Sequence, residues 1–451
     1  MELFSTTKPV RPCTLPIGPT VAYLKNKINF NNMKLTDESP KNMEQLSMGS
    51  SNPDSPSWVE PQTSRAKLIN KRWMDYQGFK NWEGLLDPLD DNLRSEIIRY
   101  GHFVEAAYRS CDFNPSSSSY ATCRYSKKKL LSESGFPGTG YRVTKNLIAT
   151  SLIELPGWAE RGPTWMAMRS GWVGYVAVCQ DAREISRLGR RDVVIAFRGT
   201  ATGLEWLENL RATLTPLPNP DSDLCPDSAG SDSDPDSQPM VESGFLSLYT
   251  SGLKNRPSLQ KLLWQEISRI LGKYGDEPLS FTITGHSLGA ALATLAAYDI
   301  KKTFKKQLRV TVISFAGPRV GDRSFRCHLE KQGTKILRIV NSDDLITKVP
   351  GFVVDDNENE NDGSLNNSGG YTAAAAAGLA RWFHKLVEAM KWVYADVGCE
   401  LRLSSRDSPY LNDINFATCH DLKTYLHLVD GFVSSNCPFR TTARKIMNVT
   451  N

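Results

Sequence analysis

The amino-acid sequence predicts an α/β fold, in which helices flank a mostly parallel central sheet. Segments rich in β-branched and aromatic residues alternate with helical segments, as is typical of parallel strands joined by helices. We expect strands at 171–180, 192–197, 279–284, 309–316 and 335–341. We expect helices at 93–108 and 258–274, where apolar residues recur every three or four positions, and an Ala-rich helix at 290–298.

Composition narrows the class of protein further. The chain has 451 residues, of which 40% are apolar and 23% charged, which excludes a collagen-like or wholly disordered protein. Its nine cysteines are scattered and form no CxxC pair, so they predict neither a disulfide miniprotein nor a zinc site. An odd cysteine count without a framework favours a reducing compartment. No apolar stretch is long enough to span a bilayer.

The N-terminal segment differs from the rest of the chain. Residues 1–36 hold five bases and a single acid, Glu2, together with several hydroxyl residues and no apolar core. This composition is typical of an organelle transit peptide, and a disordered tail without a targeting role is the alternative. We therefore expect an organelle transit peptide and a disordered linker at 1–57, followed by one globular domain at 58–451 with acidic surface loops near 216–240 and 355–370.

The charge is unevenly distributed. The net charge is +5, but residues 221–242 hold seven acids and residues 355–362 hold five, with no Lys or Arg in either stretch. The rest of the chain has 54 basic residues against 37 acidic ones. This excess of basic residues is suited to contact with an anionic lipid surface, although a solvated basic surface without a partner explains the charge equally well.

One turn carries the strongest chemical signal. Residues 285–289 read Gly-His-Ser-Leu-Gly and lie between an expected strand and an expected helix. In this G-x-S-x-G pattern a sharp turn exposes the serine hydroxyl, and the flanking glycines leave room for it. We therefore predict Ser287 as a nucleophile, with Gly285, His286 and Gly289 forming its turn. An ordinary Gly-Ser turn is the alternative.

A serine nucleophile needs a histidine base, and six histidines are available. In hydrolases with this turn the order along the chain is Ser, then Asp or Glu, then His. This order excludes His102 and His286, which do not follow Ser287. His328 leaves little room for an intervening acid, and His384 lies in an expected helix beside basic residues. The two remaining candidates are His420 and His427.

The acid is expected just beyond a strand end. Asp343 and Asp344 follow the expected strand at 335–341, and their positions in the sequence do not separate them. Whichever is not catalytic is expected to cap the turn.

An oxyanion hole needs backbone donors near the serine. The backbone N–H of Leu288, at the helix start, is one candidate. Thr200, after the strand at 192–197, is the other, and an ordinary turn at 198–200 is the alternative. Apolar residues share one face of the segment 204–210, which predicts a short lid helix over the site or, equally, a buried helix.

Several blocks of the chain resemble class 3 lipases. They are FRGT at 197–200, LEWLEN at 204–209, TITGHSLGAALA at 282–293, FAGPRVG at 315–321 and DDLITKVP at 343–350. Two further blocks, NWEGLLDPL at 81–89 and CHDLKTYLH at 419–427, resemble the plant plastid phospholipases A1 of the anther-dehiscence type. Because the blocks occur in the right order over most of the chain, the resemblance is specific.

This resemblance implies an α/β-hydrolase fold and selects among the candidates. It assigns the catalytic acid to Asp344 and the base to His420, and leaves His427 structural. Thr347 stands where many lipases have proline, which is not a catalytic position. The implied activity is hydrolysis of the sn-1 ester of phospholipids, and of galactolipids in some members, which in plants feeds oxylipin hormone synthesis.

The resemblance also implies that the transit peptide expected at 1–57 directs the protein to a plastid, and it implies the partners. The substrate is a membrane lipid met at an interface, with no metal, organic cofactor, nucleic acid or transmembrane segment, and the oligomeric state stays open. Two alternatives remain: a triacylglycerol lipase, and a non-catalytic signalling module built on a lipase-like fold.

Overall fold

The computed structural model describes residues 62–114, 116–150, 170–199, 213–217, 238–304, 308–348, 393–408, 411 and 415–435. All of them belong to one unit, which spans Pro61–Val353 and Thr372–Asn451. Several predictions lie outside the described residues: the transit peptide at 1–57, Thr200, the lid helix at 204–210, His384 and most of the two acidic loops.

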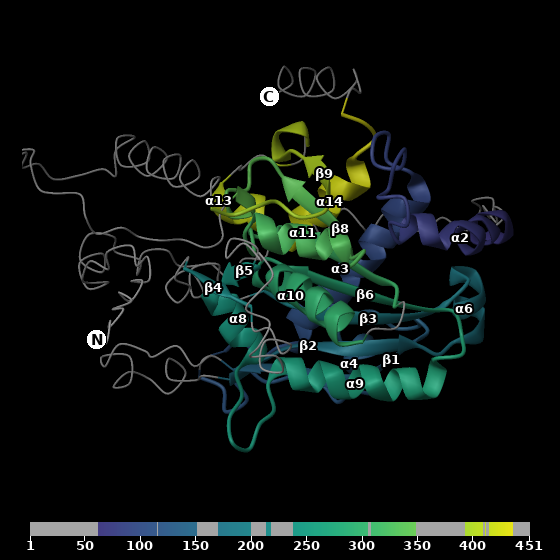
Figure 1. Ribbon diagram of the computed structural model, residues 1–451. Helices are drawn as coiled ribbons and strands as arrows, with labels where there is room; N and C mark the ends of the chain where they lie inside the picture. Colours follow the sequence, from purple (N-terminus) through teal and green to yellow (C-terminus); the bar gives the residue numbers. More distant parts are fainter. Residues whose placement is uncertain are drawn as a thin grey trace, which may run out of the picture. The chain divides into compact units, whose positions relative to one another are not determined.

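A seven-stranded sheet forms the centre of this unit, in the order β1-β2-β3-β6-β7-β8-β9 (Figure 1). Its strands are β1 (Tyr141–Thr150), β2 (Ser170–Cys179), β3 (Arg191–Phe197), β6 (Leu279–His286), β7 (Val310–Phe315), β8 (Lys335–Asn341) and β9 (Cys399–Leu403). In this sheet β3, β6, β7, β8 and β9 pair in parallel, whereas β1 and β2 form an antiparallel edge. The predicted mostly parallel sheet is confirmed, and the antiparallel edge is an addition that the sequence pattern did not indicate.

Helices cover both faces of the sheet (Figure 1). They are α2 (Gln62–Tyr76), α3 (Asp91–Ser110), α4 (Leu130–Glu133), α6 (Ala182–Leu188), α8 (Ser243–Thr250), α9 (Leu259–Tyr274), α10 (Leu288–Thr303), α11 (Arg323–Lys331), α13 (Phe416–His420) and α14 (Leu422–Gly431). A second, two-stranded sheet joins β4 (Leu214–Pro216) to β5 (Met240–Glu242). The three helices predicted at 93–108, 258–274 and 290–298 correspond to α3, α9 and α10.

Strand β3 shows how the two hydrophobic layers form. Its side chains alternate, so that Val193, Ile195 and Phe197 belong to the hydrophobic cluster that includes α9 and α10, whereas Val194 and Ala196 belong to the cluster that includes α3 and α14. All five are fully buried. A strand buried on both faces reads as a continuous apolar run, which is why this segment was recognisable in the sequence. The architecture is that of an α/β hydrolase.

Helix α10 positions the site. It begins immediately after Ser287, and its first turns are rich in Gly and Ala and are buried against the sheet. Strands β6 and β8 lie on either side of β7 and point the same way, because both pair with it in parallel. The residues that follow β6 and β8 therefore meet at the carboxyl edge of the sheet, where ligands of open α/β sheets bind.

Candidate active site

Ser287 lies on a strained turn between β6 and α10. Its backbone has φ 56° and ψ −125°, a conformation that non-glycine residues rarely adopt and that concentrates at functional sites. The flanking glycines allow the turn: a Cβ at Gly285 would come within 2.2 Å of the Gly289 carbonyl oxygen, and a Cβ at Gly289 within 2.6 Å of the Arg198 carbonyl oxygen. The predicted strand–turn–helix is thus present, and it touches the end of β3.

Two further side chains meet Ser287. His420 Nε2 lies 2.9 Å from Ser287 Oγ, and His420 Nδ1 lies 2.8 Å from Asp344 Oδ2. The serine follows β6, the aspartate follows β8 and the histidine ends α13, so three segments far apart in sequence converge. Ser287 is 2% exposed, Asp344 1% and His420 8%. The arrangement is that of a nucleophile, a base and the carboxylate that orients the base.

The two adjacent aspartates have different partners. Asp344 accepts hydrogen bonds from the Ile346 backbone N–H and from His420, whose neutral form carries its hydrogen on Nδ1 here. Asp343 points elsewhere and accepts from Ser404 and Arg406 at 2.9 and 2.8 Å. Burial favours a raised pKa for Asp343, but these two partners outweigh it and lower the pKa. Only Asp344 is placed to orient His420.

Three other described histidines have partners other than Ser287. His427 Nε2 is 2.9 Å from Ser408 Oγ, the ring of His102 stacks on Phe136, and His328 Nδ1 lies 2.9 Å from the Ser324 carbonyl oxygen. The choice of His420 over His427 therefore agrees with the geometry.

His286 links the base to the end of β3 through a chain of three hydrogen bonds. Its Nε2 lies 2.7 Å from the His420 carbonyl oxygen, which can only accept, so Nε2 carries the hydrogen. Nδ1 then accepts from the Tyr108 hydroxyl at 2.8 Å, and the Tyr108 oxygen accepts from the Gly199 N–H at 3.0 Å. Burial, reinforced by the neighbouring His420, holds the pKa of His286 well below its usual range, so the ring stays neutral.

Tyr425 is a site residue that the sequence reasoning did not single out. Its hydroxyl donates to Asp344 Oδ2 at 2.7 Å and accepts from the Asn341 N–H at 3.1 Å. Burial and the nearby Asp344 charge raise the pKa of Tyr425 well above its usual value, so the phenol remains a donor. Tyr425 lies inside the block at 419–427, which was the available signal, whereas nothing local to Tyr108 pointed to this site.

The predicted oxyanion donor Leu288 lies next to Ser287 at the start of a helix. Leu288 is the first residue of α10, where backbone N–H groups have no partner within the helix. Gly199, next to the predicted Thr200, packs against the turn: a Cβ there would lie 3.1 Å from Ser287 Cβ. Thr200 itself lies outside the described residues.

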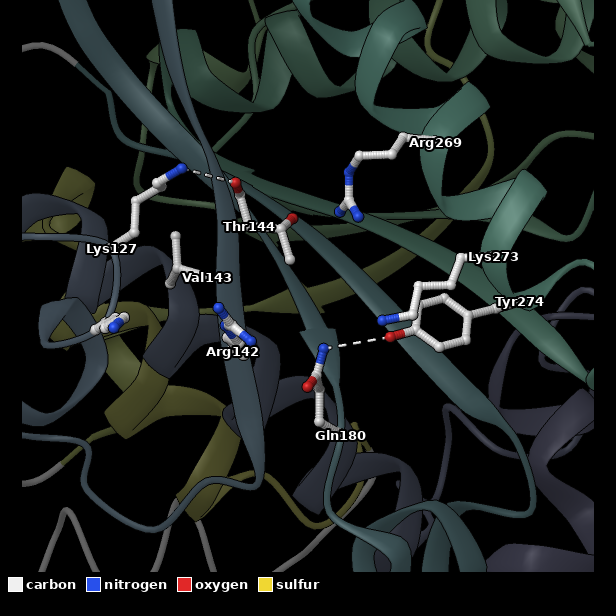
Figure 2. Close-up of a pocket in the computed structure, with 9 residues that line it drawn as sticks. Lys127, Arg142, Val143, Thr144, Gln180, Arg269, Lys273 and Tyr274 are labelled. Atoms are coloured by element: carbon white, nitrogen blue, oxygen red, sulfur yellow. Dashed lines mark hydrogen bonds between the residues drawn. The ribbon is translucent and has the colours of Figure 1, made fainter.

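A basic cavity of about 350 Å³ lies elsewhere on the sheet. Figure 2 shows Lys127, Arg142, Arg269 and Lys273 around it, together with the hydrogen bond that Gln180 donates to the Tyr274 hydroxyl. Arg142 pairs with Val178, and this row of the sheet continues through Val193 to Phe281, near the start of β6. Since Ser287 follows the other end of β6, this cavity is not part of the site.

Among the described residues, no group of three or more His, Cys, Asp or Glu side chains is arranged to hold a metal ion. Of the helices in the described ranges, none has the length and apolar character needed to cross a bilayer.

Comparison with known proteins places this geometry in a family. A family model for lipase (class 3) matches residues 194–354. The chain is 64% identical over 380 residues to the Arabidopsis thaliana protein named phospholipase A(1) DAD1, chloroplastic, covering 84% of this chain and 81% of that one.

Two further Arabidopsis thaliana proteins are similar to the chain. Phospholipase A1-Igamma2, chloroplastic, is 37% identical, with 83% of this chain and 68% of the relative covered. Galactolipase DONGLE, chloroplastic, is 40% identical, with 80% and 70% covered. The names of all three confirm the predicted plastid location. The chain belongs to the class 3 lipase family, in the plant group that contains these chloroplastic relatives.

Proposed function

We propose that this protein is a plastid serine hydrolase that releases the sn-1 fatty acid from phospholipids. The observation that carries the proposal is the line of contacts from Ser287 Oγ through His420 to Asp344, with steps of 2.9 and 2.8 Å. The substrate class follows from the Arabidopsis relative named phospholipase A(1), which shares 64% identity with the chain.

The geometry supports an acyl-enzyme mechanism. Ser287 attacks the ester carbonyl while His420 Nε2 takes the hydroxyl proton, and Asp344 holds the imidazole in the productive tautomer and stabilises its charged form. The Leu288 N–H stabilises the oxyanion, with Thr200 as the proposed second donor. The lysolipid leaves with the proton from His420, which then activates a water molecule to release the fatty acid.

Access from a lipid surface completes the proposal. The chain outside its two acidic stretches has 54 basic residues against 37 acidic ones, a charge that suits peripheral contact with an anionic membrane. We assign the segment 204–210 as a lid whose apolar face meets the lipid, and 1–57 as the transit peptide. Both assignments rest on sequence composition.

A galactolipid is the second candidate substrate. It is favoured by the 40% identity to the Arabidopsis protein named galactolipase DONGLE. Its sn-1 ester has the same chemistry as that of a phospholipid, so the same three residues would act on it.

The test is a positional assay with purified full-length protein. Phosphatidylcholine, monogalactosyl diacylglycerol and triacylglycerol are each supplied with distinguishable sn-1 and sn-2 chains, and released fatty acids are identified. We expect sn-1 release from the phospholipid and a loss of about 10⁴-fold or more in Ser287→Ala with the fold intact. Ser132→Ala, an exposed serine on α4, is the matched control.

The other outcomes contradict the proposal in different ways. Preferred release from triacylglycerol would identify a neutral-lipid lipase. Absence of release from all three lipids would favour the non-catalytic module. Turnover retained in Ser287→Ala would remove this serine as the nucleophile.

A further inference from the structure

Two cysteines face each other beside the last turn of α3. Cys111 caps the end of this helix and forms an isolated antiparallel bridge with Cys123. The flanking hydrogen bonds run from Asp112 N–H to the Thr122 carbonyl at 3.0 Å and from Arg124 N–H to the Ser110 carbonyl at 2.8 Å. Cys111 and Cys123 are therefore a non-hydrogen-bonded pair, whose side chains lie on the same face of the two strands.

This pairing has the geometry that a disulfide requires. Opposite Cα atoms of a non-hydrogen-bonded pair lie about 4.5 Å apart, within the roughly 4.4–6.8 Å that cystines span. The loop between the cysteines is held by its own contacts, since Asp112 accepts hydrogen bonds from the Ser119 hydroxyl at 2.6 Å and the Asn114 N–H at 3.1 Å. The two thiols, which are free in this structure, stay opposite one another.

The two thiols differ in access. Cys111 is 1% exposed, whereas Cys123 is half-buried and its Sγ contacts the Tyr125 carbonyl at 3.3 Å. Burial raises the pKa of both thiols, and at Cys111 the Arg198 charge opposes this rise. A reagent from solution therefore reaches Cys123 first, and the guanidinium assists the second thiol in its reaction with the first.

We propose that Cys111 and Cys123 form a reversible disulfide by exchange with a small-molecule or protein disulfide. The Cys123 thiolate attacks one sulfur of the incoming disulfide, forms a mixed disulfide and releases one thiol. The Cys111 thiolate then attacks Cys123 Sγ, forms the internal disulfide and releases the second thiol. The two cysteines are oxidised, and one external disulfide is reduced to two thiols.

The disulfide would fasten the loop that supports the end of β3. The Ala121 carbonyl accepts from the Trp172 N–H at 2.8 Å, and the ring of Phe113 lies 5.1 Å from the Arg198 guanidinium. Arg198 in turn donates to the carbonyl of Gly199 at 2.7 Å. Closing the loop restricts the unfolded chain and raises the stability of the oxidised form.

The sequence provides a direct readout. Trypsin cleaves after Arg109 and Arg124 and at no position between them, so one peptide, 110–124, contains both cysteines. Full-length protein is reduced, desalted, incubated with glutathione disulfide, alkylated and digested. We expect the peptide to lose two hydrogens and take up no alkyl group, and dithiothreitol to reverse this. The oxidised protein should melt at least about 2 °C higher than the reduced one.

Variants separate the two steps. In Cys111→Ser, glutathione should remain attached to Cys123, whereas Cys123→Ser should leave the buried Cys111 unmodified. Cys327→Ser, an exposed cysteine on α11, should form the disulfide as the wild type does. The proposal fails if peptide 110–124 of the wild type still takes up two alkyl groups in excess glutathione disulfide, or if oxidation leaves the melting temperature unchanged.

Discussion

A buried aspartate lies at the amino ends of the parallel strands and another lies just beyond their carboxyl ends, but the partners of the two carboxylates differ. Asp192, at the start of β3, is fully buried beside Arg99 and Arg190, with nitrogen–oxygen distances of 3.3 and 3.8 Å. Asp344, at the opposite edge, is 1% exposed and contacts His420 at 2.8 Å. Burial favours a raised pKa for Asp192, but the two guanidinium groups outweigh it and lower the pKa.

The difference shows what separates a structural carboxylate from one suited to catalysis. An arginine stays charged at every pH that the fold survives, so the Asp192 cluster holds a fixed charge and cannot pass a proton. A histidine can gain and lose a proton near neutral pH, so the carboxylate beside it stabilises a charge that appears only during reaction. Burial alone does not distinguish the two sites, whereas the partner does.

The largest expected effect is on catalysis at the carboxyl edge. Asp344→Asn should lower kcat by about 10⁴-fold and leave the fold intact, because the amide no longer holds the His420 tautomer. Asp343→Asn is the matched control, and we expect its kcat to stay within about threefold of the wild type. Steady-state assays on a soluble ester measure both. The opposite ranking would move the catalytic acid by one residue.

Asp192→Asn should lower stability and leave kcat unchanged, which is the reverse of the effect expected for Asp344→Asn. Removing this charge leaves the buried Arg99 and Arg190 with Glu96 but without their second carboxylate, which we expect to cost about 3 kcal/mol of unfolding free energy. Turnover of the protein that remains folded should be unchanged. Urea unfolding gives the first quantity and kcat per folded molecule the second. Glu330→Gln, in the exposed pair with Arg326, is the control and should cost less than about 1 kcal/mol. A loss of kcat in Asp192→Asn without a loss of stability would contradict the structural role that we give this carboxylate.

Tyr108→Phe tests the hydrogen bonds that join His286 to the end of β3. The change removes the donor to His286 and the acceptor for the Gly199 N–H. We expect kcat to fall by about 10-fold while KM changes little, because His420 and the end of β3 lose part of their support. Tyr175→Phe is the control, since that buried hydroxyl donates to the Phe103 carbonyl at 2.8 Å. Equal kcat values for the two variants would show that the hydrogen-bond chain is only structural.

The last expected effect is confined to a range of pH and concerns a third buried carboxyl group, which contacts neither an arginine nor a histidine among the described residues. Glu242 accepts from the N–H groups of Gly244 and Phe245 at the start of α8. Burial raises its pKa to about 7, although both hydrogen bonds oppose the rise. The folded state therefore keeps the proton to higher pH than the unfolded state, whose carboxyl titrates near about 4.3.

The sign of the pH dependence follows. The contribution of Glu242 to stability is fully present below about pH 4.3 and is lost as the pH rises through about 7. Relative to Glu242→Gln, the unfolding free energy of the wild type should fall over this range and level off above it. Urea unfolding at several pH values measures the difference. A constant difference would mean that the helix N-terminus keeps this carboxylate ionised.

The sequence alone was sufficient for features that depend on neighbouring residues. The continuous apolar run of β3 reflects burial of both its faces, the alternation of apolar residues in β6 reflects a period of two, and the spacing of apolar residues in α9 reflects a period of 3.6, and the sequence displays all three directly. The turn at Ser287 was recognisable from its local pattern, because its glycines are needed for close contacts within the turn and with the end of the neighbouring strand β3. Helix α14 and the edge strand β1 were missed.

Tertiary structure decided which polar groups meet. Asp343 and Asp344 are adjacent in sequence, but Arg406 and Ser404 engage the first while His420 and Tyr425 engage the second. The local pattern of apolar residues indicates which side of a helix or strand faces the core. It does not indicate which polar side chains from distant segments will contact each other, because such pairs form only when the segments pack together. The sequence was therefore enough to predict a serine, a histidine and an aspartate at the site, and the tertiary structure determined which hydrogen-bond partners each of them has.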